Sequence, residues 1–337
     1  MTAMDTARKY ANDQNLLYSL GRRDRDGIMV FLTGFRDMMR REGEYPIVDL
    51  PVPGDEPYAA YFIGDTQGDL YTSIRLYRRF AFMKERLTEK ALEKGLGEIG
   101  VKLVYLGNYS GWTPVDLPCG GLMNILFLFS LKMTRPDEIY LFRGNQETRE
   151  LREFDPHELI REIVKVFGLN DAGHILLKLN ACFAELPLFA RTPNGVVASH
   201  GGFPLDMTTP IEEIPPDLPP PILSTVWGDP QESGTYRGEI SIESNYNRYD
   251  FNRFLEWSAS NVFVRGHDPK IKGYALYDRR LLTVFSSSRY EDKGHGGIVV
   301  GRALVHDEKQ VRSVNDMYLR ELDDYTLVEG EVPDWKA

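Results

Sequence analysis

Polar side chains follow five short apolar runs, at points where each run breaks at or beside a glycine. They include an aspartate, several amides and two histidines, whose oxygen and imidazole atoms are common metal ligands. The ends of buried strands are where α/β proteins place their binding and catalytic groups. The pattern therefore indicates a metal site from which several ligands are missing. We call these five polar segments the tips. They are 64–68 (GDTQG), 107–111 (GNYSG), 143–147 (RGNQE), 199–202 (SHGG) and 265–267 (RGH).

The apolar runs that carry these tips alternate with segments of helical periodicity in the first two thirds of the chain, and little helix separates the later runs. Strands that alternate with helices favour helices packed on sheet faces, and the later run of strands favours a meander. We therefore predict an α/β protein with two packed mixed sheets flanked by helices. The predicted strands are 61–63, 101–106, 138–142, 195–198, 262–264, 281–285, 297–305 and 310–314, and the predicted helices are 70–94, 117–133, 156–167, 172–186 and 251–258.

Three segments follow from changes in composition. Residues 1–55 are mixed in charge and end in a turn-rich stretch, so they are expected to form an N-terminal helical extension. Residues 56–316 form the main domain, and residues 317–337 form a C-terminal tail that is acidic and solvated. Within the domain, the segment 210–221 holds six prolines and is expected to cross the surface in an extended form.

Composition excludes several functional classes. A formal charge of -10, with only short basic clusters among acids, argues against nucleic-acid binding. The longest apolar stretch, 121–133, is interrupted by polar residues and is shorter than the roughly 20 residues that span a membrane, so no membrane partner is expected. Only Cys119 and Cys182 occur and no signal peptide is visible, which predicts a reducing, cytoplasmic location.

The ordered set GDTQG, GNYSGW, RGNQE, HGG, WGDP and RGH resembles the PPP family of metallo-dependent Ser/Thr phosphatases, which have the calcineurin-like fold. The family pattern is GDxHG, GDxVDRG, GNHE, HGG and a later GH or AH. The resemblance spans roughly residues 58 to 310 and implies a two-metal site that activates water to attack a phosphate ester.

The resemblance also implies which residues would hold the two ions. The first ion would use Asp65, the position of Gln67, and a bridging ligand at Asn108. The second would share that bridge and add Asn145 with two histidines, His200 and His267. Gln67 stands where the family has histidine, and Asn108 where it has the bridging aspartate. Because both changes remove ligand strength or charge, they predict the loss of at least one metal.

Three further departures fall on proton transfer and phosphate binding. Gly111 and Gln146 replace the Asp and His that protonate the leaving alcohol in the family, and neither can donate a proton near neutral pH. Trp112 replaces an arginine that holds the phosphate. In contrast, Arg237 and Tyr290 match a second phosphate-binding arginine and a pocket-lining tyrosine.

These residues leave three functions open. The first is a pseudophosphatase that has lost two-metal catalysis and works by binding a protein partner, whether phosphorylated or not. The second is a phosphatase with one Mn, Fe or Zn ion, in which Asn145, His200 and His267 bind the metal and Arg237 holds the phosphate. The third is a structural subunit of a larger assembly. Each ligand position also has a simpler interpretation, in which polar residues only cap the loops that follow the strands.

Overall fold

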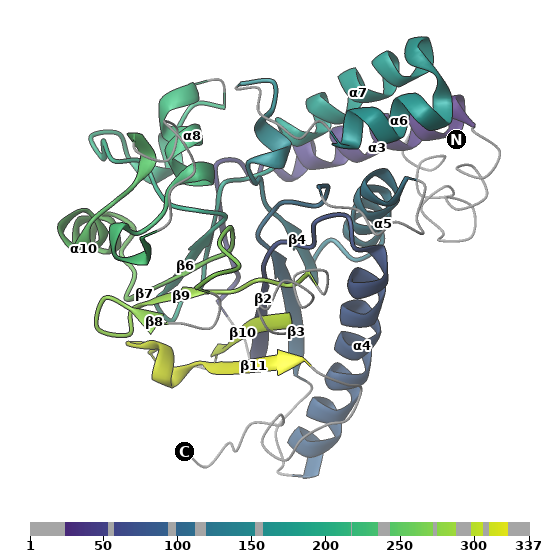
Figure 1. Ribbon diagram of the computed structural model, residues 1–337. Helices are drawn as coiled ribbons and strands as arrows, with labels where there is room; N and C mark the ends of the chain where they lie inside the picture. Colours follow the sequence, from purple (N-terminus) through teal and green to yellow (C-terminus); the bar gives the residue numbers. More distant parts are fainter. Residues whose placement is uncertain are drawn as a thin grey trace.

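The computed structural model describes residues 24–52, 57–93, 99–111, 119–151, 158–216, 218–234, 243–271, 275–287, 298–305 and 310–322. Two β-sheets pack face to face in the middle of the molecule, with helices on both outer sides (Figure 1). Trp112, Arg237 and Tyr290 lie outside the described residues, as do 1–23 and 323–337.

The first sheet carries three of the polar tips. In the described residues it has five strands in the order β11-β10-β2-β3-β4, and β2, β3 and β4 run parallel. Because these strands are parallel, their carboxyl ends, and the tips that follow them, meet at one edge. The strands are β2 (Tyr58–Ile63), β3 (Gly100–Tyr105), β4 (Ile139–Leu141), β10 (Ile298–Val305) and β11 (Tyr318–Leu322).

The second sheet carries the two histidine tips. Its order among the described residues is β1-β5-β6-β7-β9-β8, and β6 and β7 are parallel neighbours, paired from Val196 with Val262 to Ser199 with Arg265. This register places the residues that follow both strands side by side. The strands are β1 (Ile47–Asp49), β5 (Phe189–Arg191), β6 (Val196–Ser199), β7 (Val262–Arg265), β8 (Ala275–Leu276) and β9 (Leu281–Thr283).

The two sheets share one apolar core because alternate side chains of each strand point to opposite faces. On β2, Tyr58, Ala60 and Phe62 pack between the sheets with Val196 and Val262 of the second sheet. The residues between them in sequence face the outer helices. This packing holds the carboxyl ends of strands from both sheets against each other, and the polar tips extend from that junction.

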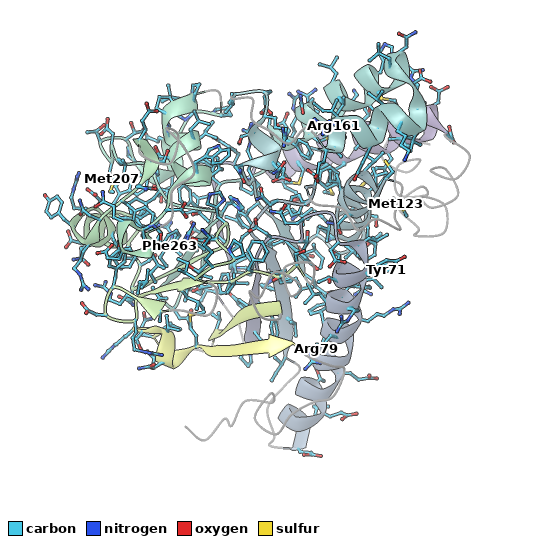
Figure 2. The ribbon with its side chains drawn as sticks, in the orientation of Figure 1. Tyr71, Arg79, Met123, Arg161, Met207 and Phe263 are labelled. Carbon is cyan, nitrogen blue, oxygen red and sulfur yellow. The ribbon has the colours of Figure 1, made fainter. Side chains whose placement is uncertain are left out.

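Helices cover the outer face of each sheet. The first sheet packs in one apolar cluster with α3 (Arg25–Glu42), α4 (Leu70–Glu93), α5 (Gly120–Thr134), α6 (Glu158–Phe167) and α7 (Leu169–Phe183). The second packs against α8 (Pro219–Trp227) and α10 (Arg248–Trp257), with Phe263 of β7 buried beneath them. Figure 2 shows Tyr71 and Arg79 along α4, and Phe263 among the inner side chains.

The predicted fold class is confirmed, and most predicted elements occur within a few residues of their expected bounds. The N-terminal segment 1–55 contains the expected helix, α3, but also β1, which joins the second sheet. The predicted strand 310–314 is wrong. A capping box at Ser313 and Asp316 turns the chain into a short 3-10 helix (Val314–Asp316) instead.

Two other segments differ from expectation. Residues 318–322, predicted as the start of a tail, form β11 because they pair antiparallel with β10. The proline-rich segment 210–221 is not fully extended, since it contains a 3-10 turn (Ile211–Glu213) and the start of α8. Pro219 opens that helix, and the first turn tolerates proline because its N–H groups have no partner within the helix. Among the described residues, no helix is long and apolar enough to cross a membrane.

Candidate metal site

Five predicted ligand residues meet where the strands of both sheets end. Asp65 follows β2, Asn108 follows β3, Asn145 follows β4, and His200 and His267 follow β6 and β7. Each side chain is at most 4% exposed. Buried polar groups must find partners in the protein or in a bound ligand. The contacts within this group therefore decide which metal ions it can hold.

Asn145 and His267 both lie next to one ring nitrogen of His200. The Nε2 atom of His200 lies 3.1 Å from Asn145 Oδ1 and 3.1 Å from His267 Nδ1. The other ring nitrogen of His200 lies 2.8 Å from the carbonyl oxygen of Leu106, so Nδ1 carries the proton and Nε2 keeps a lone pair. Ligands at right angles around an ion bound at about 2.1 Å lie about 3.0 Å apart. Both distances from His200 Nε2 therefore fit neighbouring ligands of one metal ion.

The Asp65 carboxylate accepts hydrogen bonds from two side-chain amides and one backbone N–H. Its Oδ2 atom accepts hydrogen bonds from Gln67 Nε2 at 2.9 Å and Asn108 Nδ2 at 2.7 Å. Its Oδ1 atom accepts one from the backbone N–H of His267 at 2.7 Å. A carboxylate only accepts hydrogen bonds when ionised, so both amides must turn their NH₂ groups toward it. Amide protons therefore lie where the resemblance implies a first metal, and these residues do not fit a second ion beside the one above.

Gly111 leaves space for the amide of Gln67. A Cβ atom at position 111 would lie 2.1 Å from Gln67 Oε1, and the Gly111 φ angle of 132° is one that side-chain-bearing residues rarely adopt. The two departures from the family pattern are thus sterically linked. Sequence reasoning identified both residues, but it missed their contact because they lie in loops that follow different strands.

Three residues of the site have a left-handed backbone. The φ angle is 50° at Gln67, 59° at Asn108 and 70° at His267. Such angles cost non-glycine residues free energy, and they tend to persist at functional sites where surrounding contacts hold them. The Gln67 N–H donates to the Asn108 carbonyl at 2.9 Å, which ties two of these turns together.

The side chains of Glu147 and Gln146 contact different partners, although the two residues are neighbours in one turn. The Glu147 carboxyl group accepts backbone N–H bonds from Asn108 at 2.8 Å, Tyr109 at 2.9 Å and Gly144 at 3.0 Å. Burial raises its pKa to about 7. The Gln146 side chain instead accepts a hydrogen bond from Arg149 Nη2 at 2.7 Å. Glu147 therefore holds the tips of β3 and β4 together, and Gln146 is directed to a neighbouring arginine.

A buried ion pair that sequence reasoning missed lies behind His267. Arg265 donates from Nη2 to Asp229 Oδ1 at 2.6 Å and from Nε to the carbonyl of Gly201 at 2.5 Å. The second Asp229 oxygen lies 3.9 Å from His267 Nε2. The Arg265 bond to Gly201 joins the two segments that carry the histidines, and the bond to Asp229 ties both to the loop after α8. The WGDP and RGH motifs contained the signal, although neither charge was assigned a role.

The site has a weak ligand set for hard ions. Within the residues that the structure describes, no group of three or more His, Cys, Asp or Glu side chains is placed to hold a metal. The candidate ligand set, Asn145, His200 and His267, is two imidazoles and one amide oxygen, all neutral. Such ligands suit Zn²⁺, Fe²⁺ or Mn²⁺ better than Mg²⁺. A bound ion there would act as a Lewis acid.

The curated proteins that resemble this chain in sequence include serine/threonine-protein phosphatases. No protein-family model matches the sequence. The chain is 26% identical over 268 residues to the serine/threonine-protein phosphatase 4 catalytic subunit of Saccharomyces cerevisiae, which covers 76% of this chain and 75% of that protein. It is also 26% identical over 264 residues to serine/threonine-protein phosphatase 5 of Solanum lycopersicum, covering 73% of this chain and 41% of that protein.

A solved structure has the same fold. It is a protein serine/threonine phosphatase from Saccharomyces cerevisiae with similarity to human phosphatase PP5, with a TM-score of 0.65 and 19% sequence identity, and the match covers 88% of this chain and 89% of that one. The two chains therefore share the overall fold. The chain is thus similar in sequence, at 24–26% identity, to serine/threonine-protein phosphatase catalytic subunits, and it shares the fold of a solved serine/threonine phosphatase.

Proposed function

We propose that this protein is a pseudophosphatase, a PPP-type fold that binds protein partners and lacks two-metal catalysis. The observation that carries the proposal is the pair of amide hydrogen bonds from Gln67 and Asn108 to Asp65. These bonds use the carboxylate oxygen that a first metal needs, and they satisfy its charge with amide protons.

Electrostatics supports the loss of a second ion. Two dications about 4 Å apart repel by roughly 16 kcal/mol at an effective dielectric constant of 20, four times the value for unit charges. An anionic bridge normally offsets that repulsion, and Asn108 offers only a neutral oxygen. That oxygen already accepts the backbone N–H of Gln146 at 3.0 Å. Proton donation to a leaving group is also missing, because Gly111 and Gln146 have no titratable group near neutral pH.

The experiment measures metal content and turnover of p-nitrophenyl phosphate with added Mn²⁺. We expect at most one ion per chain and turnover at the background of a metal-free control. The matched variant is Gln67→His with Asn108→Asp, which restores both ligands of the family pattern. We expect it to bind a second ion. Two ions and steady turnover in the unaltered protein would contradict the proposal.

A single-metal phosphatase is the second candidate, because the distances from His200 Nε2 to Asn145 and His267 fit one ion. In this candidate the residues hold the ion, and the ion supplies Lewis-acid activation of the phosphate ester. His200→Ala should then abolish both metal binding and activity, whereas His174→Ala, an exposed histidine on α7, should change neither. Activity that survives His200→Ala would exclude this site as its source.

A further inference from the structure

A groove of about 410 Å³ lies beside α8, outside the candidate metal site. We name it the α8 groove. Its volume falls within the roughly 300–1,000 Å³ that ligand sites occupy. Figure 2 labels Met207, in the loop that forms one wall, near α8 and α10. Apolar side chains provide most of the wall, and they include Pro204, Leu205, Ile214, Leu218, Pro221 and Trp257.

The groove is preformed, because its loop is fastened at two points. The Trp257 indole N–H donates to the carbonyl of Thr209 at 3.1 Å, and the Tyr45 hydroxyl donates to the carbonyl of Pro215 at 3.2 Å. Between these points, Ile211 and Ile214 are buried in the apolar cluster of α8 and α10. A preformed groove binds a partner at a lower entropic cost than a loop that must first become ordered.

The polar groups of the groove favour a positively charged partner. Both charged residues that line it, Asp206 and Glu243, are acidic, and no Lys, Arg or His is among its described lining residues. Several lining residues are prolines, which have no backbone N–H to donate. The single indole N–H is already bonded to Thr209. The Thr208 and Thr209 hydroxyls in the lining are neutral and can donate or accept. The apolar walls and the two acidic side chains therefore complement an aliphatic side chain beside a cation.

Leu218 is the exposed apolar contact of this surface, at 45% exposure. Because Leu218 lies at the edge of an apolar groove, a partner that fills the groove would cover this exposed side chain. Leu218 directly precedes α8, and the other end of α8 contacts the candidate metal site. The backbone N–H groups of Gly201 and Gly202 donate to Thr225 of α8, and the Trp227 ring lies 5.7 Å from the ring of His267. α8 therefore lines the groove with its first residues and contacts the loops of the candidate metal site with its last ones.

We propose that the α8 groove binds a peptide segment of a partner protein in which an aliphatic or proline residue lies next to lysine or arginine. This names a partner class for the proposed binding function and rests on that function. It does not require a metal ion, since no candidate ligand lines the groove. The peptide-binding proposal and the proposed loss of two-metal catalysis can therefore be refuted by separate results.

The test selects random 12-residue peptides by display on the full chain and, in parallel, on Leu218→Glu. We expect the peptides enriched on the unaltered chain, and lost on the variant, to carry Lys or Arg beside Leu, Ile, Val or Pro. Absence of such enrichment, or enrichment of acidic peptides, overturns the proposal. If Leu218→Glu instead converts a dimer to a monomer in sedimentation, the groove is a self-interface and the peptide proposal is wrong.

Affinities of the strongest selected peptide are then measured by fluorescence anisotropy. Leu218→Glu should weaken binding at least about tenfold, the effect of an anchor residue worth about 1.4 kcal/mol. Asp206→Asn should weaken it by about threefold, because it removes one rim charge. This variant keeps the oxygen that accepts the Thr208 N–H, so folding is preserved.

Leu177→Glu, on the exposed surface of α7, is the matched control for the charge introduced at Leu218. It should leave peptide affinity unchanged. Metal content is measured on the same variants, so a loss of peptide binding with metal content unchanged assigns the effect to the groove. Equal weakening by Leu177→Glu and Leu218→Glu would overturn the proposal.

Discussion

Replacing Gly111 by alanine tests whether the departures at positions 67 and 111 depend on each other. The new Cβ would lie 2.1 Å from Gln67 Oε1, so the amide must move and lose its bond to Asp65. A hydrogen bond to a charged group contributes about 1.5–3 kcal/mol. The backbone strain of a side chain at φ 132° adds about 1–3 kcal/mol. The expected loss is therefore about 2.5–6 kcal/mol.

The assay is a double-mutant cycle with urea unfolding of the unaltered chain, Gly111→Ala, Gln67→Ala and the double variant. In the Gln67→Ala background only the backbone strain remains, so Gly111→Ala should cost about 1–3 kcal/mol there. The coupling free energy is the difference, about 1.5–3 kcal/mol. Additive losses, within about 0.5 kcal/mol, would show that the two residues do not contact each other and would refute the steric argument.

Further variants probe three buried charges, with one partly exposed pair as a control. Lys132→Met leaves two glutamates without their buried partner and should cost about 3–5 kcal/mol in urea unfolding, whereas Lys84→Met removes a partly exposed pair and should cost less than about 1 kcal/mol. Asp229→Asn should cost about 3–5 kcal/mol and weaken metal binding in a titration, and unchanged stability would contradict the role of the pair with Arg265. Glu147→Gln places an NH₂ group against backbone donors, so a loss of about 2–4 kcal/mol is expected, and a loss below about 0.5 kcal/mol would contradict it.

Much of the site could be predicted from sequence because each tip directly follows an apolar run. Asp65 and His200 lie within two residues of a strand end, so the strand pattern placed them together before any contact was known. The alternation of strands and helices predicted the α/β class, and the resemblance of the ordered motifs to a known family implied the fold. In contrast, the orientation of the Gln67 amide depends on a left-handed turn and on the missing side chain at Gly111, and neither is visible as periodicity.

The elements that sequence reasoning missed are short or depend on partners. β1 has three residues, and its identity as a strand comes from pairing with β5 rather than from its own pattern. β11 lies in a segment with charged residues, and it exists because β10 offers an open edge. The Arg265 and Asp229 pair was equally hidden, since charged residues are usually exposed and their burial appears only when two loops meet.

The most direct test is a crystal of the protein soaked in Mn²⁺, with anomalous diffraction data. If amides occupy the coordination positions of Asp65, at most one anomalous peak should appear, between Asn145, His200 and His267, with no peak beside Asp65. Two peaks about 3.5–4 Å apart, one of them bound to Asp65, would contradict the account.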